Sequence, residues 1–459
     1  MYMIKYFLIL PLLLAMLFLG AISAEAANRY VRAGATGANN GTDWTNAYTA
    51  LPSSLVRGDV YYIADGTYAS YTFDDAVSDT TLITIKKSTV ADHGTNTGWL
   101  DTYGDGQAIF GGWEIYTDYW VFDGQRRNSD WRAGGINQYG IRIKVNGGKA
   151  IRLDNGSGTG GDNLTFQYVD VEGGGRDTGD SSSDVIYGLT GNSNITFQFC
   201  ALHDSDRTIF LMRGNWENLI IDHCYIARNA SSPGNHGEMM SMTSATNLRF
   251  SNNTVEDTEG TAGLIAGLNG GIWSGGQVYG NTLRYSPAYL ACTGRPGGAC
   301  EGMAAAIFVG HDASNDNTGN NILVYNNTFV NLTGVWSGIH IEAGFGNIVR
   351  NNIWYNCDRT GGTGTTNGQN WYFNTVNDTP GTGDQTCSSN CNIFTNLTGG
   401  DFHLTTATNA GLNVGTAYYV DPDGVIRGSD GTWDRGAFEF GSGGVNITRP
   451  VSPIKLRPQ

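Results

Sequence analysis

A short alternation of apolar and polar positions recurs through the middle of the chain, and most copies end at an Asn. In the copy that begins at Asn247, Leu248 and Phe250 point to one side of an extended strand, whereas Arg249 and Ser251 point to the other. The alternation therefore predicts short strands with one buried face. Six further copies share the pattern and begin at Asn163, Asn194, Asn218, Gly276, Asn321 and Asn347.

Aligning the seven copies places one residue of each in a common column. Its members are Val169, Cys200, Cys224, Asn253, Asn281, Asn327 and Asn352, at successive spacings of 31, 24, 29, 28, 46 and 25 residues. One copy has too little apolar surface to fold alone, so neighbouring copies must stack and share a core.

Stacked coils of this length predict an all-β fold, a single-stranded parallel β-helix with caps at both ends. A β-propeller is the weaker alternative, because its repeats are longer and usually carry an aromatic signature. Asn side chains in the column can hydrogen-bond to one another along the helix axis. Cys200 and Cys224 share this column, so they form either a stacked buried pair or a disulfide.

The pattern divides the chain into five parts. Lys5, an apolar run from Phe7 to Leu19 and a small-residue cleavage site give the first part the layout of a secretory signal peptide. A short helix is expected around residues 45–56, and the 46-residue step predicts a loop on one side of the helix. The parts are a signal peptide (1–26), an N-terminal cap with the first coils (27–118), the β-helix (119–400), C-terminal coils with a cap (401–440) and a flexible tail (441–459).

Composition supports this picture. The 66 Gly, the 15% of charged residues and the 40% of hydrophobic residues disfavour both a helical chain and a disordered one. A net charge of −15 disfavours nucleic acid and anionic membranes as partners but suits bound Ca²⁺. No later segment reaches the length of a membrane span. The mature protein is therefore expected to be secreted, soluble and monomeric.

Seven Cys residues suit an oxidising compartment. Cys292 and Cys300 lie close in sequence, as do Cys387 and Cys391, and both separations suit local disulfides. The odd total leaves at least one free thiol. Metal ligation is the weaker alternative, because no CxxC pairs or His-rich tracts accompany these residues.

The repeats, the opening from Tyr30 to Phe73 and the closing segment from Asp430 to Phe440 resemble the pectate-lyase-like superfamily of secreted bacterial right-handed β-helix proteins. The resemblance implies a right-handed helix and an extracellular polysaccharide as partner. The stretch from Gly237 is similar to the region of chondroitinase-B-like and alginate lyases that carries a calcium-binding acid and then a basic residue. Glu238 stands near the acid position, but Thr243 or Ser244 stands where those lyases have a catalytic Lys.

Elimination at a uronic acid needs a base and a group that neutralises the substrate carboxylate. No Lys occurs between Lys149 and Lys455, so His, Arg or Tyr is expected to act as the base. Counting back from the column gives two sets of equivalent positions, each expected to form a ladder on one outer face. The first set is Arg207, His236 and His311 with Asp312, and the second is Arg213, His340 and Glu342.

The lyase hypothesis assigns the base to His340 or His311, with His236 in the same ladder, and charge neutralisation to Arg213 or Arg207. Calcium is expected at Glu238, Glu342 or Asp312. Asp204, Asp206 and Asp257 offer a carboxylate pair for glycoside hydrolysis or a Ca²⁺ site, unless they only cap turns. The alternative function is a non-catalytic extracellular protein that binds glycans or serves as a surface structure.

Overall fold

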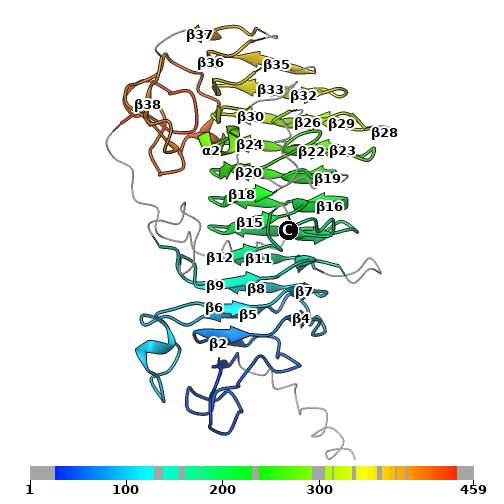
Figure 1. Cartoon of the computed structure of the whole chain (residues 1–459), viewed down its shortest axis with the longest axis vertical. Coiled ribbons are helices and arrows are strands. Elements are labelled where there is room, and N and C mark those ends of the chain that lie inside the picture. The colour runs from blue at the N-terminus through cyan, green and yellow to red at the C-terminus, as the bar shows by residue number, and fades with distance from the viewer. Residues whose placement is uncertain are drawn as a thin grey trace, which may run out of the picture.

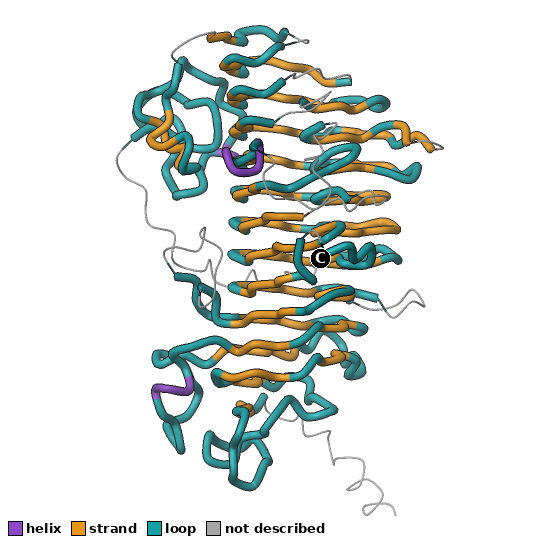
Figure 2. Tube along the Cα trace, viewed as in Figure 1, coloured by secondary structure: helices purple, strands orange, loops and turns teal. Residues whose placement is uncertain are grey.

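The chain winds into a tall stack of coils (Figure 1). In this computed structural model almost all regular structure is strand, with short loops between strands (Figure 2). No helix among the described residues is long and apolar enough to cross a membrane. The structure describes residues 26–128, 138–154, 161–176, 178–229, 237–291, 305–312, 315–332, 338–358, 364–377, 380–387 and 391–441.

Three long parallel sheets form the stack, and most coils contribute one strand to each sheet in turn. Sheet A contains β1 (Asn28–Val31), β2 (Val60–Ile63), β5 (Ile83–Lys87), β8 (Trp120–Asp123), β11 (Leu164–Gln167), β14 (Ile195–Gln198), β17 (Ile220–Asp222), β20 (Arg249–Ser251), β24 (Gln277–Tyr279), β30 (Leu323–Tyr325), β33 (Asn347–Arg350) and β35 (Thr365–Gly368).

Sheet B follows sheet A in each coil and forms the left-hand side of the stack in Figure 1. It contains β3 (Gly66–Tyr68), β6 (Ala108–Phe110), β9 (Ile141–Lys144), β12 (Val169–Glu172), β15 (Ala201–Ser205), β18 (Tyr225–Asn229), β21 (Thr254–Glu256), β25 (Thr282–Arg284), β31 (Thr328–Val330), β34 (Ile353–Tyr355), β36 (Trp371–Phe373) and β37 (Gln385–Cys387).

Sheet C completes each coil. It contains β4 (Tyr71–Phe73), β7 (Trp113–Ile115), β10 (Lys149–Arg152), β13 (Asp184–Gly188), β16 (Thr208–Glu217), β19 (Met240–Thr246), β22 (Ile265–Gly267), β26 (Ile307–Val309) and β32 (Ile339–Ile341), with β23 (Ile272–Ser274) and β29 (Thr318–Asn320) beside them. The predicted single-stranded parallel β-helix is therefore confirmed.

The inward side chains stack from coil to coil, as the alternation predicts. Phe122, Phe166 and Phe197 lie on successive strands of sheet A, with ring centroids 4.8 and 4.6 Å apart, and all three are fully buried. Because the strands are in register, each inward residue meets its equivalent one coil away. The coils thus share one continuous apolar core.

The predicted Asn column is also confirmed. Successive Asn side chains donate to one another along the axis, from Asn253 to Asn281 (3.0 Å), Asn281 to Asn327 (2.9 Å) and Asn327 to Asn352 (2.9 Å). Each of these carbonyl oxygens also accepts the backbone N–H of the Asn one coil earlier. The ladder continues to Asn370, whose oxygen accepts from Asn352 at 3.0 Å. Buried amides are satisfied in this way without water.

The described cysteines confirm part of what the sequence predicts for them. Cys200 and Cys224 are buried free thiols that extend the column below the Asn ladder, and Cys357 is also buried and free. The stacked pair is therefore the outcome, not a disulfide. Cys387 and Cys391 form the predicted disulfide. Cys292 and Cys300 lie outside the described residues.

The N-terminal region differs from one expectation. Residues 45–56 contain no helix, so the predicted short helix is wrong. Asp43 accepts hydrogen bonds from the backbone and side chain of Asn46, and Asp75 accepts the backbone N–H of Leu55, so side chains hold this segment as turns. The described helices are short: η1 (Asp101–Tyr103), α2 (Pro287–Leu290) and η3 (Thr416–Tyr418).

The C-terminal region folds back along the side of the helix. β38 (Phe394–Asn396) and β39 (Asp401–Leu404) form an antiparallel pair outside the three sheets. Further on, the Pro422 carbonyl oxygen lies 3.2 Å from Nε2 of His223, many coils down the stack. This lobe, labelled β38 in Figure 1, lies beside the upper coils on the side of sheet B.

Candidate functional site

The first predicted ladder is not a set of touching side chains. Arg207 precedes β16 and binds Asp184, which also pairs with Lys149 at 3.0 Å. His311 follows β26, three coils or roughly 14 Å further along the axis. His311 and Asp312 form β27 (His311–Asp312), which pairs with β28 (Asn315–Asp316), and their side chains lie outside the described part of the chain. His236 also lies outside it.

The second predicted ladder divides in the same way. Arg213 on β16 donates to the Ser241 hydroxyl at 3.0 Å. His340 lies on β32, four coils or roughly 19 Å away. His340 and Glu342 do lie together on the outer face of sheet C, with 3.1 Å between Nε2 and Oε1, and the His340 ring stacks on Phe308. Of the two residues, His340 is buried, with 4% of its surface exposed.

The predicted metal ligands are held by their own surroundings. Glu238 is buried and accepts hydrogen bonds from the Thr261 hydroxyl and the Ala262 backbone. Asp257 accepts from the backbone and hydroxyl of Ser286, which is the turn-capping role. Within the described ranges, no group of three or more His, Cys, Asp or Glu side chains could hold a metal ion.

A different set of ionisable residues gathers on the outer face of sheet B. The register of the strands places one outward side chain of each coil in a line that we call the outer row. Its lower members are charged except for one Ala, and its upper members are uncharged. From β9 upward the outer row consists of Lys144, Glu172, His203, Ala227, Glu256, Arg284, Val330, Tyr355 and Phe373.

The lower part of this face forms one ion-pair network. Glu172 pairs with Lys144 at 2.9 Å and also with Arg142. His203 bridges two carboxylates, with Nε2 2.7 Å from Asp170 and Nδ1 2.6 Å from Asp204. Arg228 then binds Asp204 at 2.6 Å. We call these seven residues the charged cluster: Arg142, Lys144, Asp170, Glu172, His203, Asp204 and Arg228.

The electrostatics of the charged cluster favour its ionised form. Burial opposes a charge on His203, but Asp170 and Asp204 outweigh it and raise the pKa of the imidazole to about 9. Burial also opposes a charge on Asp204, yet Arg228 and His203 hold its pKa well below the usual range. At neutral pH the cluster therefore has four cationic groups against three carboxylates, in a chain of net charge −15.

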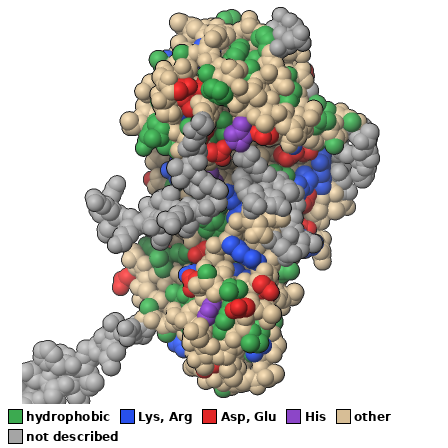
Figure 3. All heavy atoms as spheres, turned by 90° about the vertical axis from the view of Figure 1, so that its left-hand side faces the viewer, with side chains coloured by type: hydrophobic (Ala, Val, Ile, Leu, Met, Phe, Trp, Pro, Cys, Tyr) green, Lys and Arg blue, Asp and Glu red, His purple; other side chains and the backbone are tan. Residues whose placement is uncertain are grey.

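Only part of the charged cluster reaches solvent. The side chains of Lys144 and Arg228 are 46% and 30% exposed, whereas those of His203 and Asp170 are 6% and 2% exposed. Figure 3 shows this face, with Lys and Arg side chains near its middle between the broader ends of the molecule. The Asp204 side chain is 26% exposed beside Arg228, so a ligand would meet a cation at Lys144 and an ion pair at Arg228.

Most of this cluster was not expected from the sequence. The pattern singled out only Asp204, together with Asp206 and Asp257. The six other members were missed: Arg142, Lys144, Asp170, Glu172, His203 and Arg228. The sequence did contain a signal for the cluster. In each coil that contributes to it, the charged residues come one to four positions after the column residue, on the strand of sheet B or directly after it. Asp206 is buried apart from the cluster and accepts from the Thr178 hydroxyl at 3.1 Å.

Comparison with solved structures shows similar folds at low sequence identity. Pectate lyase Pel9A is 15% identical with a TM-score of 0.45, and the match covers 91% of this chain and 97% of that one. A mutant of the PL6 family alginate lyase AlyGC is 12% identical with a TM-score of 0.37, covering 76% and 53%. The Dettilon tailspike protein is 13% identical with a TM-score of 0.28, covering 72% and 55%.

No family model and no curated protein matches the sequence. This chain spans about half the length of the alginate lyase and tailspike chains that it matches. At such identities the likeness concerns the fold alone. The three parallel sheets confirm the expected parallel β-helix fold.

Proposed function

We propose that this chain is a secreted carbohydrate-active protein, and specifically a polysaccharide lyase or a related enzyme that acts on an acidic polysaccharide. The observation that carries the proposal is the charged cluster, which has one more cation than carboxylate and whose most exposed side chain is that of Lys144, on an otherwise acidic molecule. Its strands β9, β12, β15 and β18 are neighbours in sheet B, so the cluster extends over roughly 14 Å of the axis. A polyuronate lying along this face would place carboxylates at Lys144 and Arg228.

Elimination can be assigned to the lower end of the cluster. The Lys-free stretch begins after Lys149 and so does not include Lys144. Lys144 and Arg142 meet at one carboxylate, Glu172. In the proposed step the ammonium group of Lys144 first gives a proton to solvent, and the neutral amine then removes the proton next to the substrate carboxylate, while the charge of the neighbouring Arg142 stabilises that carboxylate. The electron pair forms a carbon–carbon double bond, the glycosidic carbon–oxygen bond breaks, and the leaving oxygen takes up a proton from solvent.

Calcium has no assigned place in this step. The carboxylates of the charged cluster already accept from Lys, Arg or His side chains, so the described residues do not fit a Ca²⁺ site. The expectation of Ca²⁺ at Glu238, Glu342 or Asp312 is tested by a chelator in the assay below.

One observation favours the second candidate function, a non-catalytic extracellular glycan-binding or structural protein. Each basic group of the cluster is already paired with a carboxylate, and His203 is protonated at neutral pH, which leaves it unable to accept a proton there. Such a network suits binding without turnover.

The deciding experiment incubates the purified chain with pectin, alginate, glycosaminoglycan and neutral polysaccharides, with and without a chelator. Ultraviolet absorbance from unsaturated uronate and new reducing ends are measured together. A lyase gives both signals, a hydrolase gives reducing ends alone, and binding without either supports the second candidate. Lys144→Met should abolish elimination. Arg249→Met is the matched control, because Arg249 lies on the outer face of sheet A. No binding and no product with any acidic polymer would refute the proposal.

A further inference from the structure

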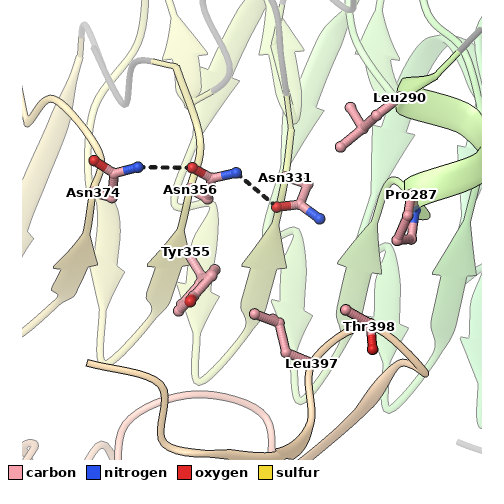
Figure 4. Close-up of a pocket in the computed structure, with 8 residues that line it drawn as sticks. All are labelled: Pro287, Leu290, Asn331, Tyr355, Asn356, Asn374, Leu397 and Thr398. Atoms are coloured by element: carbon pink, nitrogen blue, oxygen red, sulfur yellow. Dashed lines mark hydrogen bonds between the residues drawn. The ribbon is translucent and has the colours of Figure 1, made fainter. Parts of the chain in front are cut away.

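A cavity of about 410 Å³ opens beside the upper coils, where the C-terminal lobe approaches sheet B (Figure 4). One wall consists of the turns that follow β31, β34 and β36, and the opposite wall is the loop after β38. The short helix α2 closes one end. Eight residues line the cavity: Pro287, Leu290, Asn331, Tyr355, Asn356, Asn374, Leu397 and Thr398.

Three amides form one wall of this cavity. Asn374 donates to Asn356 at 2.8 Å, and Asn356 donates to Asn331 at 2.9 Å, so the side chains form a line across consecutive coils (Figure 4). Asn331 in turn donates to the Tyr285 carbonyl oxygen. Each carboxamide carries two N–H groups, and the ladder uses one of them. The second N–H of each amide, and the oxygen of Asn374, can therefore serve a ligand.

The backbone explains why Asn recurs here. Asn331, Asn356 and Asn374 have φ values of 57°, 52° and 44°, in the left-handed region that Asn tolerates better than most residues. The amides are thus held at a regular spacing of roughly 4.8 Å by the coil repeat.

The remaining walls are apolar or hydroxylic. Pro287, Leu290 and Leu397 present aliphatic surface, and Tyr355 and Thr398 add a phenol and a hydroxyl. None of the eight described lining residues is charged. A charged ligand would lose its hydration without gaining a counter-charge, which costs several kcal/mol or more. A neutral sugar has apolar faces and many hydroxyls that both donate and accept, which matches this mixture.

The cavity lies above the charged cluster on the same sheet, and the C-terminal lobe covers the stretch between them. Tyr355 belongs to the outer row, two coils above Arg284. Arg284 pairs with Glu256 below it and donates to the Thr398 carbonyl oxygen at 3.2 Å above it. One side chain thus joins the charged part of sheet B to the loop that forms the cavity wall. Val330, which lies between Arg284 and Tyr355 in the outer row, is fully buried against Phe394 and Phe402 of the lobe, so a ligand reaches the cavity from outside the outer row.

We propose that the cavity binds an uncharged sugar residue of a glycan. The ligand class is a neutral saccharide, held by the amide ladder and the apolar walls rather than by charge. This inference goes beyond the proposed function, and the cavity is tested without it.

Calorimetric titration of the full chain with cellotetraose, mannotetraose, galactotetraose and xylotetraose tests the proposal, with tetragalacturonate as the charged probe. At least one neutral tetrasaccharide should bind. Asn356→Gly removes one amide without backbone strain, because Gly occupies equivalent left-handed turn positions such as Gly275 and Gly346. It should weaken binding about tenfold, the loss of one or two well-placed hydrogen bonds. Thr398→Trp should abolish binding by filling the cavity from the loop.

The matched control is Asn247→Gly. Asn247 has a φ of 56° and belongs to an equivalent exposed amide ladder before sheet A, where it donates to Asn218 at 3.1 Å. Its substitution should leave binding unchanged. Equal affinity in wild type, Asn356→Gly and Thr398→Trp, or no binding of any neutral probe, would overturn the inference.

The two proposals fail separately in this design. If neutral probes bind at the cavity but acidic polymers neither bind nor react, the cavity stands and the proposed function falls. If acidic polymers bind through Lys144 while the neutral probes ignore the cavity, the proposed function stands and the inference falls.

Discussion

The lower and upper halves of the outer face of sheet B share one backbone but differ in chemistry. From β9 to β25 the outer row is mostly charged and its members form ion pairs across coils. From β31 to β36 it is apolar or aromatic, and amides flank it. Strand register is kept throughout. The helix therefore fixes where an outward side chain stands and leaves its chemistry free to vary.

The inward column changes at a different level. It is apolar or sulfur-bearing at Val169, Cys200 and Cys224, and becomes an amide ladder from Asn253 upward. The outward change comes two coils later, between Arg284 and Val330. Because the two changes do not coincide, the outer face is not a by-product of the core. We expect stability to follow the inward column and binding to follow the outer face.

The largest effect is expected from a substitution that breaks the inward Asn ladder. Asn327 donates to Asn352 and to the carbonyl oxygens of Val278 and Tyr325, and accepts from Asn281. Asn327→Leu should lower the free energy of unfolding by about 4 kcal/mol or more, since several buried partners lose their hydrogen bonds. Chemical denaturation followed by circular dichroism measures this. Asn356→Gly, in the exposed ladder, should cost less than about 1 kcal/mol. Equal losses would show that the inward column has no special role.

The second prediction concerns how stability depends on pH, and it tests the lower, charged half of the outer face. The folded pKa of His203 is about 9, above its ordinary value of 6.5, so its ion pairs stabilise the folded state fully below about pH 6.5 and lose this effect as pH rises through 9. The change should amount to roughly 3 kcal/mol. The free energy of unfolding of wild type and His203→Gln is compared from about pH 6 to about pH 10. The wild-type advantage should shrink with pH.

Comparing the two proteins also cancels the contributions of other titrating groups to the pH dependence. The pKa of His403 is raised as well, chiefly by its hydrogen bond to Asp423, and burial raises the pKa of Glu439 to about 7. Both are present in both proteins and cancel in the difference. A constant difference across the range would mean that His203 does not gain its charge from Asp170 and Asp204.

The fold was predictable because its determinants are local and repeated. Asn253, Asn281, Asn327 and Asn352 mark the same inward turn, and that column is what the structure shows. The site was not predictable by the same counting. Positions counted back from the column cross loops of unequal length, so Arg207 and His311 have nearly equal offsets, but Arg207 precedes its strand of sheet C and His311 follows its own. Positions counted forward stay close to the strand and keep their register, as Glu172 and His203 do.

The ion pairs of the charged cluster could not be predicted from the sequence repeat for another reason. His203 finds its partner Asp170 at a separation of 33 residues, and Arg228 finds Asp204 at 24. Which charged residue faces which depends on loop lengths elsewhere in each coil, and a single sequence gives no measure of these. The same holds for the cavity, whose Leu397 and Thr398 come from outside the repeats.

A smaller effect sharpens the functional side of the comparison. Lys144→Glu reverses an exposed charge at the lower end and should weaken binding of an acidic polysaccharide about tenfold, which is about 1.4 kcal/mol. Binding of a neutral tetrasaccharide at the upper end should not change, because Lys144 and Tyr355 are seven coils apart in sheet B. Calorimetry on both ligands tests this. If both affinities fell together, the variant would have disturbed the fold, and the thermal midpoint would show it.

The smallest effect needs no mutation. Raising the salt concentration from about 0.02 M to about 0.5 M shortens the distance over which exposed charges act from roughly 20 Å to a few ångströms. Affinity for the acidic polysaccharide should fall severalfold, because the exposed side chains of Lys144 and Arg228 attract it through solvent. Affinity for the neutral tetrasaccharide should change less than about twofold, since its contacts are hydrogen bonds and apolar faces. Equal salt dependence would mean that both ligands occupy the charged half, and the division of the outer face into two binding regions would be wrong.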